Sequence, residues 1–143
     1  MGLFDKMMRF ANGYRGGADQ PDGATSKAAE QSPRERSLLE ELAAEAEEQT
    51  PAVRYALLFS GTVQGVGFRW NNQMLARDRK LTGRVRNLDD GTVEMEIQGP
   101  PATVGAHFGR LHAYYSRFGN RIWLDRAEEL PVVPGERDFR VIG

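Results

Sequence analysis

The sequence contains no cysteine, and this absence removes several possibilities at once. Disulfides, thiol chemistry and phosphatases with a cysteine nucleophile all require that residue. Long apolar runs are also missing, since no stretch approaches the roughly 20 apolar residues that span a membrane. The N-terminal residues lack the apolar core and cleavage site of a secretory signal. We therefore expect a cytoplasmic protein without disulfides.

The chain also has little net charge, with 19 Lys and Arg against 20 Asp and Glu. Proteins that bind nucleic acid or anionic membranes through a broad surface carry a clear basic excess. We therefore expect no binding to nucleic acid or to a membrane. We expect a monomer that acts on a small molecule. The charge is uneven, because residues 1–50 hold 6 basic and 10 acidic side chains whereas residues 51–143 hold 13 and 10. The mildly basic second part suits a small anionic substrate.

Residues 1–50 are predicted to form a flexible acidic extension, mostly disordered, ahead of a folded domain at 51–143. Residues 1–13 contain a short amphipathic stretch. Residues 12–31 are rich in Gly, Ala, Asp, Gln and Ser without apolar periodicity, which is typical of a linker.

One short helix is predicted within this extension, at about residues 33–48. The run Ser32-Pro33-Arg34-Glu35 is a capping box with proline at the first helical position. Its apolar stripe of leucine and alanine is narrow, and an isolated helix of this length is marginal in water. We therefore expect a solvated or loosely docked helix without a chemical role.

The domain itself shows alternating strand patterns and helical stripes in the order β-α-β-β-α-β. A strand is predicted at 53–59, a helix from 70 to 80, strands at 81–88 and 93–98, a helix from 101 to 117, and strands from 122 and at 139–142. An Asp-Gly pair separates the second and third strands and predicts a hairpin. This order predicts a two-layer α+β sandwich, an antiparallel sheet with two helices on one face.

A glycine-bearing turn from Gly61 to Arg69 joins the first strand to the first helix. Backbone N–H groups at a helix start have no intrahelical partner, and the helix dipole places partial positive charge there. Gly65 and Gly67 let the backbone approach a ligand closely, and Arg69 adds a planar fork of donors. Such a loop can cradle a phosphate group. The same residues could equally form an ordinary tight turn with a solvated arginine.

Other phosphate motifs do not fit the sequence. A dinucleotide-binding fingerprint would need glycine where Trp70 stands, and no Gly-Lys-Ser/Thr run of a Walker A loop is present. The run Asp89-Asp90-Gly91-Thr92 suggests an aspartyl-nucleophile phosphatase, but Leu88 occupies the position of the nucleophile. A hairpin turn is therefore the better interpretation of that run.

The glycine turn resembles the signature of the acylphosphatase family, in the form Gly61-x-Val63-Gln64-Gly65-Val66-x-Phe68-Arg69. A second signature follows in the right order, Gly83-x-Val85-x-Asn87-Leu88-x-Asp90-Gly91-x-Val93-Glu94, ending at Gln98-Gly99-Pro100. The resemblance covers about residues 52–143 and implies a ferredoxin-like fold. It implies metal-independent hydrolysis of the carboxyl-phosphate bond of small acyl phosphates to a carboxylate and inorganic phosphate.

The resemblance also implies roles for particular residues. Arg69 would bind the phosphate and Asn87 would orient the attacking water. The remaining phosphate oxygens would be held by the backbone amides of the loop, which belong to Gln64, Gly65, Val66, Gly67 and Phe68. From its position alone, Asn87 could instead assist the neighbouring Asp-Gly turn.

No triad, paired acid and base, or metal cluster stands out in the sequence, and an acyl phosphate explains why none is needed. Its leaving group is a carboxylate whose conjugate acid has a pKa of about 4, so it departs without a proton. Positioning and charge stabilisation can therefore suffice. We expect no cofactor, no metal site and no phosphoenzyme. His107 and His112 are five apart and are expected at the surface.

Two other functions remain open at this point. One is a non-catalytic or auxiliary acylphosphatase-like module that binds phosphate or another anion, as at the head of the large carbamoyltransferases of hydrogenase maturation. The other is an RNA-binding sandwich of the same fold, which Glu94 and Glu96 on the third strand disfavour. The sequence departs from the family pattern at Arg84 and between residues 116 and 126, which puts substrate preference in question.

Overall fold

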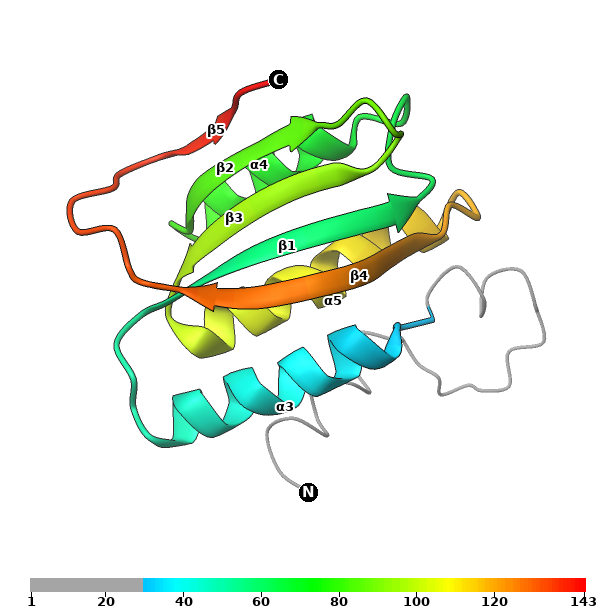
Figure 1. The fold of residues 1–143 in the computed structure, drawn as a ribbon. Helices are drawn as coiled ribbons and strands as arrows, with labels where there is room; N and C mark the ends of the chain where they lie inside the picture. The colour runs from blue at the N-terminus through cyan, green and yellow to red at the C-terminus, as the bar shows by residue number, and fades with distance from the viewer. Residues whose placement is uncertain (1–29) are drawn as a thin grey trace.

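The computed structural model describes residues 30–143, which form one layer of sheet backed by helices (Figure 1). The expectations for residues 1–29 lie outside the described part. The elements follow in the order α3 (Pro33–Glu47), β1 (Val53–Gly61), α4 (Phe68–Asp78), β2 (Thr82–Asn87), β3 (Val93–Gly99), α5 (Pro101–Ser116), β4 (Ile122–Leu130) and β5 (Phe139–Val141). The predicted β-α-β-β-α-β order is confirmed.

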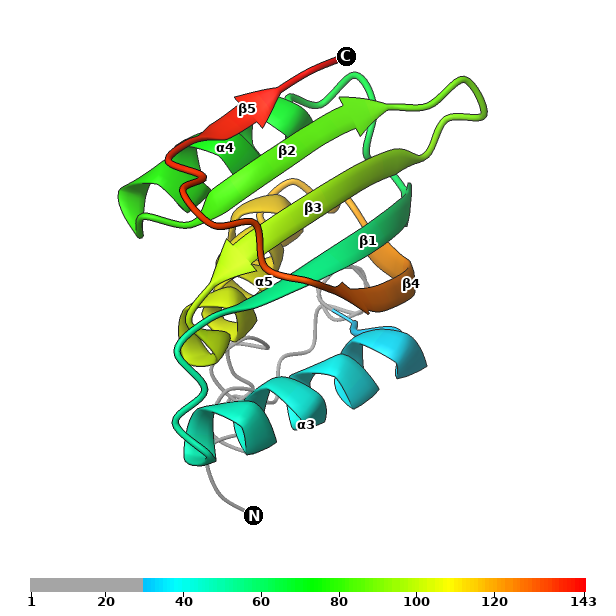
Figure 2. The same ribbon diagram turned by 60° about the vertical axis from the view of Figure 1, so that its left-hand side comes forward.

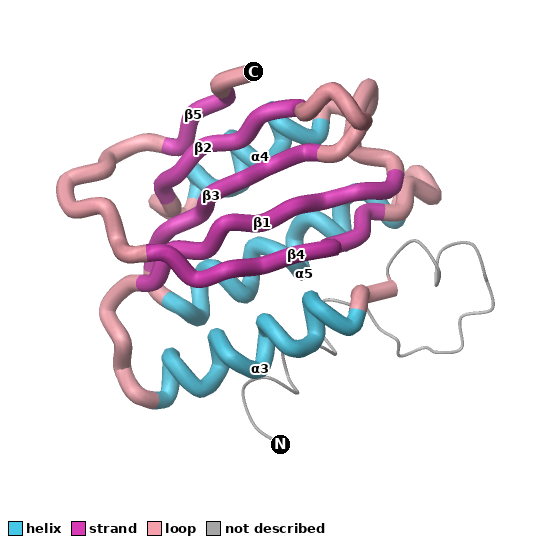
Figure 3. Tube along the Cα trace, viewed as in Figure 1, coloured by secondary structure: helices cyan, strands magenta, loops and turns pink. Residues whose placement is uncertain are grey.

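The five strands form one sheet in the order β4-β1-β3-β2-β5 (Figure 3). β1 is an inner strand and pairs antiparallel with both β3 and β4, and β2 pairs antiparallel with β3. β5 runs parallel to β2, with Gly83 opposite Phe139. The sheet is therefore mixed, where the sequence predicted an antiparallel one, because the last strand adds to the outer edge of β2.

Period-two alternation decides which face of the sheet is buried. Tyr55, Leu57 and Phe59 of β1 are each at most 2% exposed and face the helices. α5 packs against the same face with an apolar stripe of Val104, Phe108, Leu111 and Tyr115. Figure 2 shows α4 and α5 side by side behind the sheet. α4 begins two residues earlier than predicted, and its buried face is Phe68, Asn72 and Ala76, which leaves Trp70 and Met74 exposed.

The helix α3 packs firmly on the domain, so the expectation of a solvated or loosely docked helix is wrong. Leu38, Leu39 and Leu42 are each at most 1% exposed and join the main hydrophobic core. Ser32 caps the helix by accepting from the Glu35 amide, as the capping box predicts, and its hydroxyl donates to the Leu124 carbonyl of β4 at 2.6 Å. α3 thus extends the helical layer past α5, along the β4 edge of the sheet (Figure 1).

The two histidines are buried, although the sequence predicted surface positions. Each is 1% exposed, because α5 lies between α3 and α4 and buries more than one stripe of its surface. His112 Nε2 lies 2.9 Å from a carboxylate oxygen of Glu35 on α3. His107 Nε2 lies 2.8 Å from the Asn72 side-chain oxygen on α4. Both histidines therefore tie helices together.

The opposite face of the sheet carries a strap, residues 131–138, that leads from β4 across to β5. Arg54 on β1 is 3% exposed and donates to Glu96, to Gln98 and to Glu136 of the strap. The Gln98 side chain also exchanges two hydrogen bonds with the backbone of Val133. This network fixes the path by which the chain reaches β5, the strand that flanks the candidate site.

Candidate active site

The loop between β1 and α4 is held at both ends by buried side chains and curls between them. Val63 and Phe68 are each 1% exposed. Gly65 and Gly67 take left-handed backbone conformations, with φ of 78° and 73°, which residues with a side chain rarely adopt. Gly67 is the N-cap of α4 and offers no side-chain cap. The first amides of α4 are therefore left for another acceptor.

The amides of residues 64–68 make no hydrogen bond to any described residue. A Cβ built on Gly65 would meet nothing within 4 Å, so the loop is open at this point. Successive free N–H groups beside a helix N-terminus form a concave donor surface that suits an anion. The amides of the predicted phosphate-binding loop can therefore donate to a bound anion, because no described residue accepts a hydrogen bond from them.

Side chains from elsewhere brace the loop without using these amides. The Tyr115 hydroxyl donates to the Val66 carbonyl at 3.1 Å and accepts from the Asn71 side chain at 2.8 Å. Burial raises the pKa of the Tyr115 hydroxyl, which therefore remains a donor. The Gln64 side chain donates to the carbonyls of Leu88 and Thr92, at 2.9 Å each. The loop is thereby tied to α5 and to the β2–β3 hairpin.

Sequence reasoning missed these braces. The helical period of α5 places Tyr115 on the buried apolar stripe of that helix. The partner of its hydroxyl is 49 residues away in the chain and leaves no local signal. Gln64 was assigned only a backbone role, whereas its side chain joins the two signature segments.

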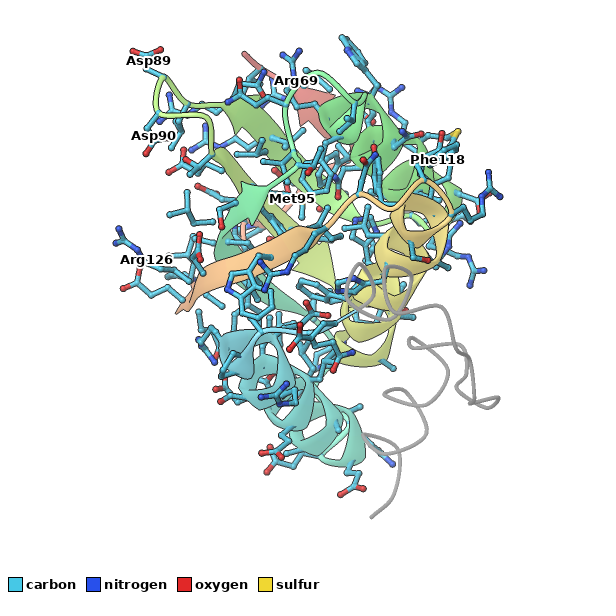
Figure 4. The ribbon with its side chains drawn as sticks, turned by 90° about the vertical axis from the view of Figure 1, so that its right-hand side faces the viewer. Arg69, Asp89, Asp90, Met95, Phe118 and Arg126 are labelled. Atoms are coloured by element: carbon cyan, nitrogen blue, oxygen red, sulfur yellow. The ribbon has the colours of Figure 1, made fainter. Side chains whose placement is uncertain are left out.

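Arg69 and Asn87 meet at a single carbonyl group. The Arg69 guanidinium donates through Nη1 to the main-chain oxygen of Gly143. The backbone N–H of Asn87 donates to the same oxygen at 3.2 Å. Figure 4 shows Arg69 at the end of the molecule where the loop and the β2–β3 hairpin lie. The two residues that the resemblance singles out, one on α4 and one on β2, are therefore neighbours in space.

The Asn87 side chain lies on the face of β2 that packs against α4. Asn87 follows Val85 by two residues, and Val85 is fully buried on that face. The Asn87 side-chain oxygen is itself buried and accepts no hydrogen bond from a described residue. A buried carbonyl oxygen without a donor is costly, so a water or ligand donor is its natural partner.

The carboxylates of the Asp-Gly hairpin lie outside this site. Asp90 Oδ1 accepts from both the amide and the hydroxyl of Thr92, which lowers the pKa of this carboxyl and closes the predicted hairpin turn. Figure 4 shows Asp89 and Asp90 at the tip of that hairpin, away from Arg69. Within residues 30–143, no cluster of three or more His, Asp or Glu side chains could hold a metal ion. No helix in this range is long and apolar enough to cross a bilayer.

Comparison with known proteins places this site in a family. The family model described as Acylphosphatase matches residues 55–141. An acylphosphatase of Geobacillus kaustophilus is 59% identical over 89 residues, which cover 62% of this chain and 93% of the relative. One of Geobacillus thermodenitrificans is 40% identical, again over 62% of this chain and 93% of the relative.

Among solved structures, HypF of T. kodakarensis is 27% identical and superposes with a TM-score of 0.52. The match covers 64% of this chain and 12% of that larger chain, so the fold also occurs as one part of a longer protein. The family match takes in more than half of the sequence, including the loop, Arg69, Asn87 and β5. This chain belongs to the acylphosphatase family.

Proposed function

We propose that this protein is an acylphosphatase that hydrolyses the carboxyl-phosphate bond of small acyl phosphates, with Arg69 and Asn87 as its catalytic residues. The observation that carries the proposal is the meeting of these two residues at the Gly143 carbonyl, beside a loop of free amides. A phosphate binder and a water-orienting group are thereby brought to one place.

Arg69 and the loop amides bind the phosphoryl group. The loop presents the N–H groups of residues 64–68, and Arg69 adds a planar cation suited to phosphate oxygens. With Nη1 on Gly143, the remaining guanidinium donors make no hydrogen bond to a described residue. Charge that develops on the phosphoryl oxygens in the transition state is stabilised by these fixed donors.

Asn87 orients the attacking water. Its side-chain oxygen accepts a hydrogen bond from the water, which aims a lone pair at phosphorus. The P–O bond to the acyl oxygen breaks as the water oxygen attacks in line, and the products are a carboxylate and inorganic phosphate. The carboxylate leaves as an anion, so no general acid is required. No side-chain nucleophile, metal ion or cofactor takes part in the proposed reaction.

We further propose that the protein is a cytoplasmic monomer that does not bind nucleic acid. The edge strand β4 carries the charged residues Asp125, Arg126, Glu128 and Glu129, which oppose edge-to-edge association. Ser32 and Arg34 at the start of α3 also donate to two of its carbonyls, those of Leu124 and Ala127. On the outer sheet face, the exposed Arg84 and Arg86 of β2 are paired with Glu96 and Glu94 of β3, which opposes binding of a polyanion there. Light scattering with size-exclusion chromatography checks the mass, and a second peak at twice the monomer mass would contradict it.

Hydrolysis of benzoyl phosphate in the presence of EDTA tests the catalytic proposal. Wild-type protein should turn over, and Asn87→Ala should lose about a hundred- to a thousandfold in kcat, as expected when one stabilising or orienting group is removed. Asn120→Ala is the matched control, because Asn120 lies on the α5–β4 turn and its side chain makes no hydrogen bond to a described residue.

The outcomes separate the proposal from its alternative. A folded Asn87→Ala variant with wild-type turnover would contradict the water-orienting role. A wild-type protein that binds inorganic phosphate but does not hydrolyse benzoyl phosphate would instead identify an anion-binding module, since the loop amides and Arg69 are sufficient for binding alone. Loss of activity with EDTA would show that a metal ion takes part.

A further inference from the structure

One face of α4 holds the segment 138–143 through a regular series of side chains. Arg69, Gln73 and Arg77 are spaced four residues apart and therefore lie along one side of the helix. We call these contacts the α4–β5 ladder: Arg69 donates to the Gly143 carbonyl, Gln73 to the Phe139 carbonyl at 3.0 Å, and Arg77 to both carboxylate oxygens of Asp138 at 2.8 and 2.9 Å.

The other side of this segment is held by the backbone of β2. The Gly83 amide donates to the Asp138 carbonyl, the Ile142 amide to Val85, and the Asn87 amide to Gly143. β5 itself is only three residues long, from Phe139 to Val141, and it is an edge strand. So short a strand has little stability of its own, and its placement depends on contacts from both sides.

The ladder ends at the candidate site. Gly143 is the point where Arg69 and Asn87 meet, so the position of segment 138–143 sets the position of the carbonyl that orients the Arg69 guanidinium. Arg69 is half-buried, and its side chain makes no hydrogen bond to any other described residue. Without that carbonyl, its long side chain would be free to sample many rotamers.

We propose that Gln73 and Arg77 are positioning residues for the phosphate-binding arginine. They keep β5 docked on α4, and the Gly143 carbonyl then holds the Arg69 guanidinium in place before substrate binds. This inference rests on the proposed role of Arg69 in phosphate binding. It assigns a function to two side chains that touch neither the loop nor the reacting atoms.

The effect of breaking the ladder is expected on binding rather than on the chemical step. A mobile Arg69 must be ordered each time a phosphate group binds, and this cost falls on substrate and inorganic phosphate alike. Ordering one long side chain corresponds to roughly a two- to tenfold loss of affinity. Once bound, Arg69 is ordered in both enzymes, so kcat should change little.

Arg77→Met tests the proposal, with Arg79→Met as its matched control. The two arginine side chains are similarly exposed, at 52% and 55%, but Arg79 pairs with Asp78 and does not touch segment 138–143. We expect Arg77→Met to raise the KM for benzoyl phosphate and the inhibition constant of inorganic phosphate together, by about two- to tenfold. Arg79→Met should change neither, and kcat should stay within about twofold in both.

Three further single variants and one double variant test whether the ladder acts as a unit. Gln73→Leu should raise the same two constants, since it removes the middle contact. Asp138→Asn should reproduce Arg77→Met, and the double variant should show no additional rise, because both changes break the same ion pair. Arg77→Lys should give an intermediate value, since lysine cannot form the bidentate contact.

Unchanged KM and phosphate inhibition in folded Arg77→Met would overturn the proposal, as would an equal change in Arg79→Met. A fall in kcat at constant KM would also contradict it. Thermal unfolding of each variant identifies any effect that arises from general destabilisation, which an exposed ion pair contributes to only weakly. Phosphate binding measured by calorimetry needs no turnover, so failure of the ladder remains distinguishable from failure of the catalytic proposal.

Discussion

Arg54 and Arg69 lie on consecutive elements of the chain, yet the fold uses them in opposite ways. Arg54 is 3% exposed, and its donors reach Glu96, Glu136 and Gln98 at 2.7 to 3.0 Å. Arg69 is half-buried, and its guanidinium pairs with no Asp or Glu side chain among the described residues. Its one side-chain hydrogen bond within residues 30–143 goes to the main-chain oxygen of Gly143.

This difference separates an arginine that holds the fold from one that can bind a substrate. The charge of Arg54 is already compensated by two carboxylates, and the strap covers it. Arg69 keeps most of its donors available beside the free loop amides. The same contrast applies to other polar groups, because His107 and Glu35 are buried in contacts between helices whereas the Asn87 side-chain oxygen lacks a donor.

The largest expected effect is that of Arg69→Ala on activity. Removing one donor that stabilises the phosphoryl oxygens typically lowers turnover by about a hundred- to a thousandfold. Stability should change little, since the side chain makes a single hydrogen bond to a described residue. Steady-state hydrolysis of benzoyl phosphate measures the effect, and Arg79→Ala is the control for loss of a surface arginine. Activity near that of wild type in folded Arg69→Ala would remove the contrast with Arg54.

Arg54→Met should show the converse pattern, with a large loss of stability. The substitution leaves Glu96 and Glu136 without their shared cation. We expect the free energy of unfolding to fall by about 2–4 kcal/mol. This loss is somewhat below that for fully buried pairs, because both carboxylates retain some contact with water. Arg84→Met is the matched control, since Arg84 also pairs with Glu96 but its side chain is 48% exposed. That variant should lose less than about 1 kcal/mol. Urea denaturation gives both values, and equal losses would contradict this interpretation.

His107 should make the protein sensitive to acid. Burial lowers the pKa of this histidine from its ordinary value of 6.5 to about 3. At a pH between these two values, His107 is protonated in the unfolded chain but not in the folded protein. The free energy of unfolding therefore falls as the pH drops from about 6.5 towards 3. Thermal unfolding across this range should show a smaller pH dependence for His107→Gln than for wild type. An identical slope in the two proteins would show that His107 does not contribute.

Tyr115→Phe should have the smallest effect, because it removes one brace and leaves the loop amides in place. The lost hydrogen bond to the Val66 carbonyl is worth about 0.5–1.5 kcal/mol. We expect kcat/KM for benzoyl phosphate to fall by about two- to tenfold if the loop loosens by a similar amount. Tyr114→Phe is the control, since Tyr114 lies beside Tyr115 but its hydroxyl contacts no described residue. A drop of the same size in both variants would contradict a specific brace.

Much of the fold could be predicted because its signals are local. The alternation in β1, the Asp-Gly hairpin and the apolar stripe of α5 each follow from residues close together in the chain. Predictions that depended on distant partners were less successful. α3 was expected to be loosely docked and the histidines exposed, but their burial arises from the packing of α3 against α5, and Glu35 and His112 are 77 residues apart.

The sequence alone determined that a glycine turn with an arginine would join a strand to a helix, because the steric freedom of glycine and the unpaired amides of a helix start are local properties. It also located Asn87 at the end of a strand. Only the tertiary structure decided that β5 would lie parallel to β2 and bring Gly143 to the Arg69 side chain and the Asn87 backbone amide, across 74 residues in the case of Arg69. Such a meeting depends on the register of strands and the docking of a helix, which no single stretch of sequence encodes.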